Sequence, residues 1–175
     1  MRRREDSKIL LKRTDGDAIL RPSGIHNHLQ VAVVEEFCPR FAPGANLLYV
    51  GDTALKHLVF DAHELAKLKV PVTTHDRLPD IILYWPERNW LFLIEAVTSH
   101  GPVSPKRHRE IEAMLKGCPA ERIYVTAFLD VGAFRKYAGD IAWETEVWIA
   151  ETPGHMIHFN GPKFLGPYKT TRVTK

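Results

Sequence analysis

The 175-residue chain lacks several features that define common classes of protein. It contains two cysteines, Cys38 and Cys118, which are too few for a disulfide scaffold and favour a reducing compartment. No apolar stretch is long enough for a signal peptide or a membrane span. From these absences we expect a soluble, cytoplasmic protein.

Several catalytic motifs are also missing from the sequence. There is no glycine-rich phosphate loop, no Cys-x-x-Cys pair for zinc and no Gly-x-Ser-x-Gly elbow. The net charge of +3, from 24 basic and 21 acidic residues, is only mildly positive. A polyanionic partner would therefore have to be bound by local basic patches rather than by the overall charge.

The sequence does contain two neighbouring apolar runs that each carry one acid. The runs are residues 78–85 and 90–98, and the four residues between them suit a hairpin loop. Runs this apolar are typical of strands covered on both faces, where an unpaired charge is costly. If the residues that flank the loop pair with each other, Asp80 lies directly opposite Glu95.

Two carboxylates at opposed positions on neighbouring strands repel each other, because their Cβ atoms are only about 5 Å apart. A divalent cation that bridges Asp80 and Glu95 would turn this repulsion into a binding site, and Mg²⁺ prefers carboxylate and water ligands. The alternative is that one acid is protonated or forms a salt bridge. The apolar context offers few other partners and favours the metal.

A helix expected from Ile25 to about Phe37, ended by Pro39, adds a third acid. Glu36 lies within the apolar arc of this helix, whereas Glu35 projects away from it. Glu36 is therefore either directed toward the core or part of an ion pair at the helix end. The adjacent residues His26-Asn27-His28 do not match the HNH nucleases, whose motif is spread over a hairpin and a helix.

The densest positive cluster follows the second apolar run. Residues 99–105 lead into a helix that we expect to end near Lys116, and its first turns hold Lys106-Arg107-His108-Arg109. Positive charge at a helix N-terminus opposes the macrodipole, and the free backbone N–H groups there suit phosphate. A solvated helix face is the alternative, but the nearby acids favour phosphate binding.

The remaining elements complete an α/β sandwich around a mixed sheet. Because a helix precedes it, the strand at 122–127 should run parallel to an earlier strand. Residues 1–17 are expected to be a loosely ordered basic N-terminal arm, and residues 18–175 one domain. The other expected elements are a strand at 46–50, helices at 54–70 and 131–137, and a second hairpin formed by 146–150 and 155–159.

Together these residues resemble a known family of nucleases. Pro79-Asp80 followed by Glu95-Ala96-Val97 is similar to the PD-(D/E)XK signature. Longer strings resemble the C-terminal catalytic domain of the BsuBI/PstI restriction endonucleases, over about residues 15–168. The strings are GIHNH at 24–28, YVGDT at 49–53, LPDIILY at 78–84 and NWLFLIEAVTSHGPVSPKR at 89–107.

The resemblance implies a PD-(D/E)XK nuclease-like sandwich and a Mg²⁺-dependent type II restriction endonuclease. Such an enzyme hydrolyses double-stranded DNA at a short palindrome, usually as a homodimer. The resemblance also implies that Asp80 and Glu95 are the metal ligands, that Glu36 is an additional catalytic acid, and that an N-terminal domain is missing. Two alternatives are a DNA-binding domain with weak or no cleavage and a structure-directed repair nuclease.

One position departs from the family pattern. The lysine of the general signature would lie two residues after Glu95, where this chain has Val97. We expect Lys106 to act as the catalytic lysine instead, with Lys56 as a weaker candidate. The residues expected to contact DNA are Ser99, His100, Lys106, Arg107 and Arg109.

Overall fold

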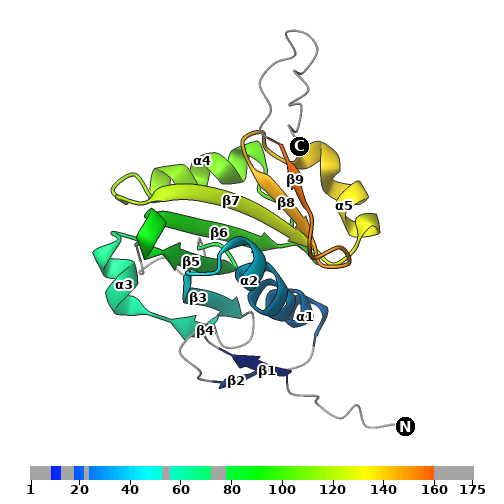
Figure 1. Ribbon diagram of the computed structural model, residues 1–175. Helices are drawn as coiled ribbons and strands as arrows, with labels where there is room; N and C mark the ends of the chain where they lie inside the picture. Colours follow the sequence, from blue (N-terminus) through cyan, green and yellow to red (C-terminus); the bar gives the residue numbers. More distant parts are fainter. Residues whose placement is uncertain (1–8, 13–17, 22–23, 53–55, 72–77, 160–175) are drawn as a thin grey trace, which may run out of the picture.

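The computed structural model describes residues 9–12, 18–21, 24–52, 56–71 and 78–159 (Figure 1). Within these residues, the centre of the molecule is a seven-stranded mixed sheet in the order β4-β3-β5-β6-β7-β8-β9. Two further strands, β1 and β2, form a separate antiparallel pair. The strands are β1 (Ile9–Lys12), β2 (Ala18–Arg21), β3 (Asn46–Asp52), β4 (Lys56–Phe60), β5 (Ile81–Trp85), β6 (Trp90–Ala96), β7 (Glu121–Phe128), β8 (Glu146–Ile149) and β9 (Met156–His158).

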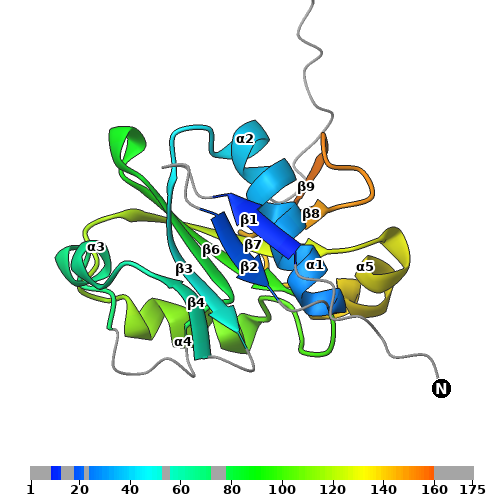
Figure 2. The same ribbon diagram turned by 90° about the horizontal axis from the view of Figure 1, so that it is seen from below.

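Helices cover both faces of the large sheet, which confirms the expected α/β sandwich. Figure 2 shows α1 and α2 on one side of the sheet and α4 on the other. A π-helical segment, Val33–Phe37, joins α1 to α2. The helices are α1 (Ile25–Ala32), α2 (Cys38–Phe41), α3 (Ala62–Lys67), α4 (Pro105–Met114) and α5 (Val131–Tyr137).

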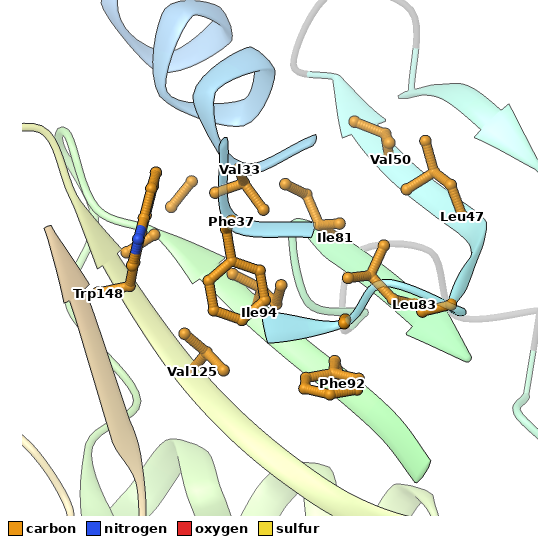
Figure 3. Close-up of a cluster of buried hydrophobic side chains, with 14 of the residues drawn as sticks. Val33, Phe37, Leu47, Val50, Ile81, Leu83, Phe92, Ile94, Val125 and Trp148 are labelled. Carbon is orange, nitrogen blue, oxygen red and sulfur yellow. The ribbon is translucent and has the colours of Figure 1, made fainter. Parts of the chain in front are cut away.

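Alternate residues of the central strands point to opposite faces, and both faces are buried. Ile81 and Leu83 of β5 belong to the same apolar cluster as Phe37 of the π-helical segment (Figure 3). Ile82, which lies between them, belongs to a second cluster with Ile111 of α4. Because both faces are covered, a charge on these strands is largely removed from water.

The hairpin of β5 and β6 has the expected register. The two strands pair antiparallel from Trp85 opposite Trp90 to Ile81 opposite Ile94. Asn89 in the turn adopts a left-handed conformation, with φ of 55°, which asparagine tolerates better than most residues. The next positions along the two strands are the two acids.

The other strand pairings also agree with the sequence. β6 and β7 run parallel with α4 between them in the chain, and β8 and β9 form the expected antiparallel hairpin. β8 is parallel to β7, so the carboxyl ends of β6, β7 and β8 lie at one edge of the sheet. Loops that leave this edge are well placed to form a site.

The expected helix at 54–70 is wrong in its first half. Residues Lys56–Phe60 form β4, which pairs with β3 at the edge of the sheet. Asp61 marks the change from strand to helix, because its carboxylate accepts a hydrogen bond from the Glu64 N–H (3.0 Å) and caps α3. Pairing with a sheet edge has overridden a weak helical periodicity.

The first helix also differs from the expectation. It continues through Pro39 into α2, and the Cys38 N–H bonds to the carbonyl of Val33, five residues earlier. This wider π turn rotates the side chains that follow it relative to an ordinary α-helix. Glu36 consequently has a side chain that is 45% exposed instead of pointing into the core.

Part of the expected basic arm has regular structure. Strand β1 lies within residues 1–17, and it pairs with β2 across the boundary that the sequence suggested at residue 17. In the described part of the chain, no helix is long and apolar enough to cross a membrane.

Candidate active site

A cleft of about 790 Å³ lies at the open end of the β5–β6 hairpin, away from its turn. Its walls come from the start of α1, the beginning of β5, the end of β6, the connection after β6 and the first two turns of α4. The polar or charged residues that line it are His26, Asp80, Glu95, Ser99, His100, Ser104, Lys106, Arg107 and Glu110.

Asp80 is fixed at the entrance to β5 by two backbone contacts. Its Oδ2 atom accepts a hydrogen bond from the Ala96 N–H at 2.8 Å, and its carbonyl accepts one from the Gly51 N–H at 2.8 Å. The side chain remains 31% exposed. One carboxylate oxygen is therefore anchored to β6 while the other, Oδ1, is available to the cleft.

Glu95 is the more deeply buried of the two acids, with a side chain that is only 12% exposed. Burial raises the pKa of Glu95 to about 7, the neighbouring Asp80 carboxylate adds to this rise, and the Arg107 guanidinium opposes it. The structure therefore brings the two acids together, as the hairpin register predicted. Glu95 also has the salt-bridge partner that was part of the alternative considered for the pair, while burial raises its pKa.

Arg107 is the partner of Glu95. Its Nε atom donates a hydrogen bond to Glu95 Oε1 at 2.7 Å, and its side chain is 23% exposed. Arg107 lies in the first turn of α4, where its N–H donates to the Ser104 hydroxyl at 3.2 Å and so caps the helix. The helix start thus delivers a positive charge to the acid pair.

Helix α4 is held on the sheet by packing and by a polar contact. Ile111 and Leu115 are fully buried. Glu112 accepts hydrogen bonds from Arg122 Nε at 2.8 Å and from the Tyr124 hydroxyl, both on β7. These contacts fix the helix that carries Arg107.

Sequence reasoning missed His26. Its Nδ1 atom lies 3.2 Å from the Thr98 hydroxyl oxygen, and its Nε2 atom lies 3.7 Å from Asp80 Oδ1. No signal in the sequence marked it. In the structure Gln30, four residues later on the same face of α1, donates to the Gly51 carbonyl at 2.9 Å. That spacing directs this helix face toward the start of β5.

Two of the predicted residues lie in less direct positions. Lys106 lines the cleft, but its side chain is 82% exposed and its Nζ atom is 3.9 Å from Glu110 Oε1. Glu36 is not among the cleft residues and pairs instead with Arg40 at 2.6 Å. Val97 occupies the position of the missing lysine. It is 2% exposed and packs in the apolar cluster beneath α5, so a lysine at this position would be buried among apolar side chains.

The residues expected to contact DNA surround the cleft. Ser99 and His100 line it, with 3.2 Å between the Ser99 Oγ and His100 Nδ1 atoms. Arg109 is exposed and lines a shallower groove beside it, of about 500 Å³, which also includes Lys106. The side chain of Lys56 lies outside the described residues.

The donor set of the acid pair suits a hard divalent cation. Asp80 and Glu95 supply carboxylate oxygens, and their mutual repulsion is relieved by positive charge. In the part of the chain that the structure describes, no three His, Cys, Asp or Glu side chains already converge on one metal position. An ion held here would therefore rely on water for several ligands, as Mg²⁺ usually does.

A mixed sheet between helices, with opposed acids beside a basic helix start, defines an α/β nuclease fold. The structure superposes on that of the SdaI restriction endonuclease with a TM-score of 0.83, at 43% sequence identity, covering 93% of this chain and 51% of that one. The family model for the BsuBI/PstI restriction endonuclease domain matches residues 9–162. The chain therefore belongs to the BsuBI/PstI restriction endonuclease family.

Two curated relatives show the same extent of similarity. The type II restriction enzyme BsuBI of Bacillus subtilis is 46% identical over 166 residues, which cover 95% of this chain and 52% of that protein. The type II restriction enzyme AplI of Arthrospira platensis is 28% identical over 171 residues, with 93% and 52% covered. The chain spans about half the length of the curated relatives that it matches.

Proposed function

We propose that this chain is the catalytic domain of a Mg²⁺-dependent type II restriction endonuclease that hydrolyses phosphodiester bonds in double-stranded DNA. The observation that carries the proposal is the pair of opposed acids, Asp80 and Glu95, in a cleft bordered by a basic helix start. Family membership adds support, because the relatives are named as type II restriction enzymes.

In this proposal each cleft residue has a defined task. Asp80 and Glu95 hold the cation, which when bound polarises a phosphoryl oxygen and lowers the pKa of a coordinated water. Arg107 restrains Glu95 through its Nε atom and offers its remaining guanidinium N–H groups to a phosphate oxygen. Lys106, at the rim, is free to reach the phosphate and serve as the catalytic lysine.

Three further polar residues lie beside this centre. Ser99, His100 and Arg109 are proposed to bind the DNA beside the scissile phosphate, since they line the cleft or the groove next to it. We propose a homodimer, whose two-fold symmetry would match a palindromic site cut in both strands, and we propose that it acts in the cytoplasm. About half of each relative lies outside the matched region, and we propose that an equivalent N-terminal region contributes to site recognition.

Plasmid cleavage tests this proposal. The purified chain should cut plasmid DNA into discrete fragments with Mg²⁺, and Asp80→Asn and Glu95→Gln should each reduce the rate by on the order of 10²–10³-fold or more. Glu87→Gln is the matched control, because Glu87 is an exposed acid in the turn of the same hairpin. Its rate should equal that of the wild type.

Other outcomes would redirect the assignment. Retarded DNA without products in Mg²⁺ or Mn²⁺ would indicate a DNA-binding domain that does not cleave. Cleavage determined by branches or flaps would indicate a structure-directed repair nuclease. Full activity of Asp80→Asn would contradict the proposed site itself.

A further inference from the structure

His26 enters the cleft with one ring nitrogen already engaged. Its Nδ1 atom is 3.2 Å from the hydroxyl oxygen of Thr98, 72 residues away in sequence. With the Nδ1 proton donated to Thr98, the Nε2 atom carries the lone pair and faces Asp80 Oδ1 at 3.7 Å. An imidazole whose other nitrogen is fixed by a hydrogen bond is the usual arrangement of a metal-ligating histidine.

The position of His26 is also fixed by a second set of hydrogen bonds. Gln30, one helical turn later, is fully buried, and its side-chain amide donates to the Gly51 carbonyl at 2.9 Å. The Gly51 N–H in turn donates to the Asp80 carbonyl at 2.8 Å. Because residues four apart share one face of a helix, this chain of hydrogen bonds sets where His26 lies relative to Asp80.

We propose that His26 is a third protein ligand, through Nε2, of the divalent cation held by Asp80 and Glu95. This inference rests on the proposed function, because it concerns the same cation. Two ligand atoms each about 2.1 Å from one ion are at most ~4.2 Å apart. The separation of 3.7 Å between Nε2 and Asp80 Oδ1 is within that span.

The Glu95 carboxylate completes the set through its second oxygen, Oε2, while Arg107 holds Oε1. Among the described residues no closed set of three such side chains is present, so the ion would draw the three ligands together on binding. Imidazole is a softer donor than carboxylate, whereas Mg²⁺ prefers oxygen. We therefore expect the site to bind Mn²⁺ more tightly than Mg²⁺.

The test uses Mn²⁺, whose electron spin reports directly bound nitrogen. Pulsed EPR spectra are recorded for the 175-residue chain with ¹⁵N-labelled histidine, as the wild type, His26→Asn and His28→Asn. Asparagine at position 26 keeps a polar group near Thr98 but has no atom at the place of Nε2. His28 is the matched control, because it lies on the same helix, is exposed and does not line the cleft.

We expect a histidine-nitrogen coupling in the wild type and in His28→Asn, and its loss in His26→Asn. Mn²⁺ affinity measured by calorimetry should fall by about tenfold or more in His26→Asn only. If His26→Asn does not fold, Thr98→Val is the second variant, and release of the ring should weaken the same coupling.

Two results would overturn the inference, and they are distinguishable. Mn²⁺ bound to the wild type without nitrogen coupling, or with coupling that persists in His26→Asn, would show that His26 is not a ligand while the acid pair and the proposed nuclease function stand. A wild type that binds no Mn²⁺ would refute the metal site of the proposed function as well.

Discussion

The two ends of the β5–β6 hairpin differ in their electrostatic contacts, which are favourable at the turn and unfavourable at the open end. At the turn, the Arg88 guanidinium lies over two indole rings, 4.7 Å from the centroid of Trp85 and 4.8 Å from that of Trp90. At the open end, two carboxylates face each other and the pKa of Glu95 is raised to about 7 by burial and by Asp80. One end places a cation among aromatic faces, which is favourable, and the other places like charges together, which is not.

The open end of the hairpin is therefore the less stable of the two. In Figure 2 the turn of the hairpin projects from the molecule, well away from α1, so the aromatic end has no part in the cleft. The same two strands and the same register serve both ends. A like-charge pair at a cleft, on a hairpin that is otherwise well paired, is the arrangement that the proposed binding of a cation requires.

The largest expected effect concerns the stability cost of Glu95. Its folded-state pKa is raised above the usual value of about 4.5, so the ionised side chain destabilises the metal-free protein increasingly as pH rises from about 4.5 to 7. At pH 8, Glu95→Gln should raise the free energy of unfolding by about 2–3 kcal/mol, and at pH 4 the difference should vanish. Urea unfolding in the presence of a chelator measures both values.

Glu87→Gln at the other end of the hairpin is the control, and it should leave the pH profile unchanged. An equal stability difference at pH 4 and pH 8 for Glu95→Gln would show that the effect is not ionisation. The comparison between the two ends would then lose its electrostatic basis.

The next effect concerns packing at the turn. A Cβ atom on Gly44 would lie 2.5 Å from the Nε1 atom of Trp85, so Gly44→Ala must displace the indole ring and disturb the stack with Arg88. The substitution should lower the free energy of unfolding by about 1–3 kcal/mol while the cleavage rate of the folded enzyme stays the same. Gly154→Ala, with nothing within 4 Å of the added atom, is the matched control and should change neither quantity.

A smaller effect is expected from Arg107→Lys at the open end. Lysine keeps the charge but cannot hold Glu95 and a phosphate oxygen with a planar set of donors. Plasmid cleavage should therefore slow by about tenfold, which corresponds to ~1.4 kcal/mol. A rate equal to that of the wild type would show that Arg107 only neutralises charge.

The smallest effect is expected at Glu112, behind the helix that carries Arg107. Partial burial acts to raise the pKa of Glu112, but hydrogen bonds from Arg122 and Tyr124 outweigh it and lower the pKa. The ionised group is therefore stabilising above its unfolded-state pKa, and the contribution is lost as pH falls through the folded-state pKa. Glu112→Gln should cost less than about 1 kcal/mol at pH 7 and nothing at low pH.

The same urea titrations provide the readout for Glu112. Glu110→Gln is the control on the same helix, because Glu110 is half exposed and contacts Lys106 and Arg107 only at 3.9 and 4.0 Å. A larger loss at pH 7 for Glu110→Gln than for Glu112→Gln would contradict the anchoring role given to Glu112.

The hairpin and its acids could be predicted from sequence because their geometry is local. The number of loop residues and the two-residue period of a strand set the register. These two local features are enough to predict that Asp80 lies opposite Glu95. The helix start at Lys106 and Arg107 was likewise marked by Ser104 and Pro105.

The rest of the site depended on long-range contacts or irregular backbone. His26 reaches the cleft through a contact with Thr98, and no pattern within α1 encodes that distance. For Glu36 the structure shows the second alternative, an ion pair with Arg40, and the π turn departs from the 100° periodicity that favoured a core position. The strand β4 was missed because its pairing with β3, not its own residues, decides its conformation.

The most direct test of the central claim is calorimetry of Mg²⁺ binding at several pH values in buffers with different ionisation enthalpies. We expect binding at pH 6 to release close to one proton and this release to fall toward zero by pH 8. Asp80→Asn and Glu95→Gln should each bind Mg²⁺ at least about tenfold more weakly than the wild type or Glu87→Gln. Equal affinity in all four proteins, or no proton release at any pH, would contradict the claim that these two acids are a metal site.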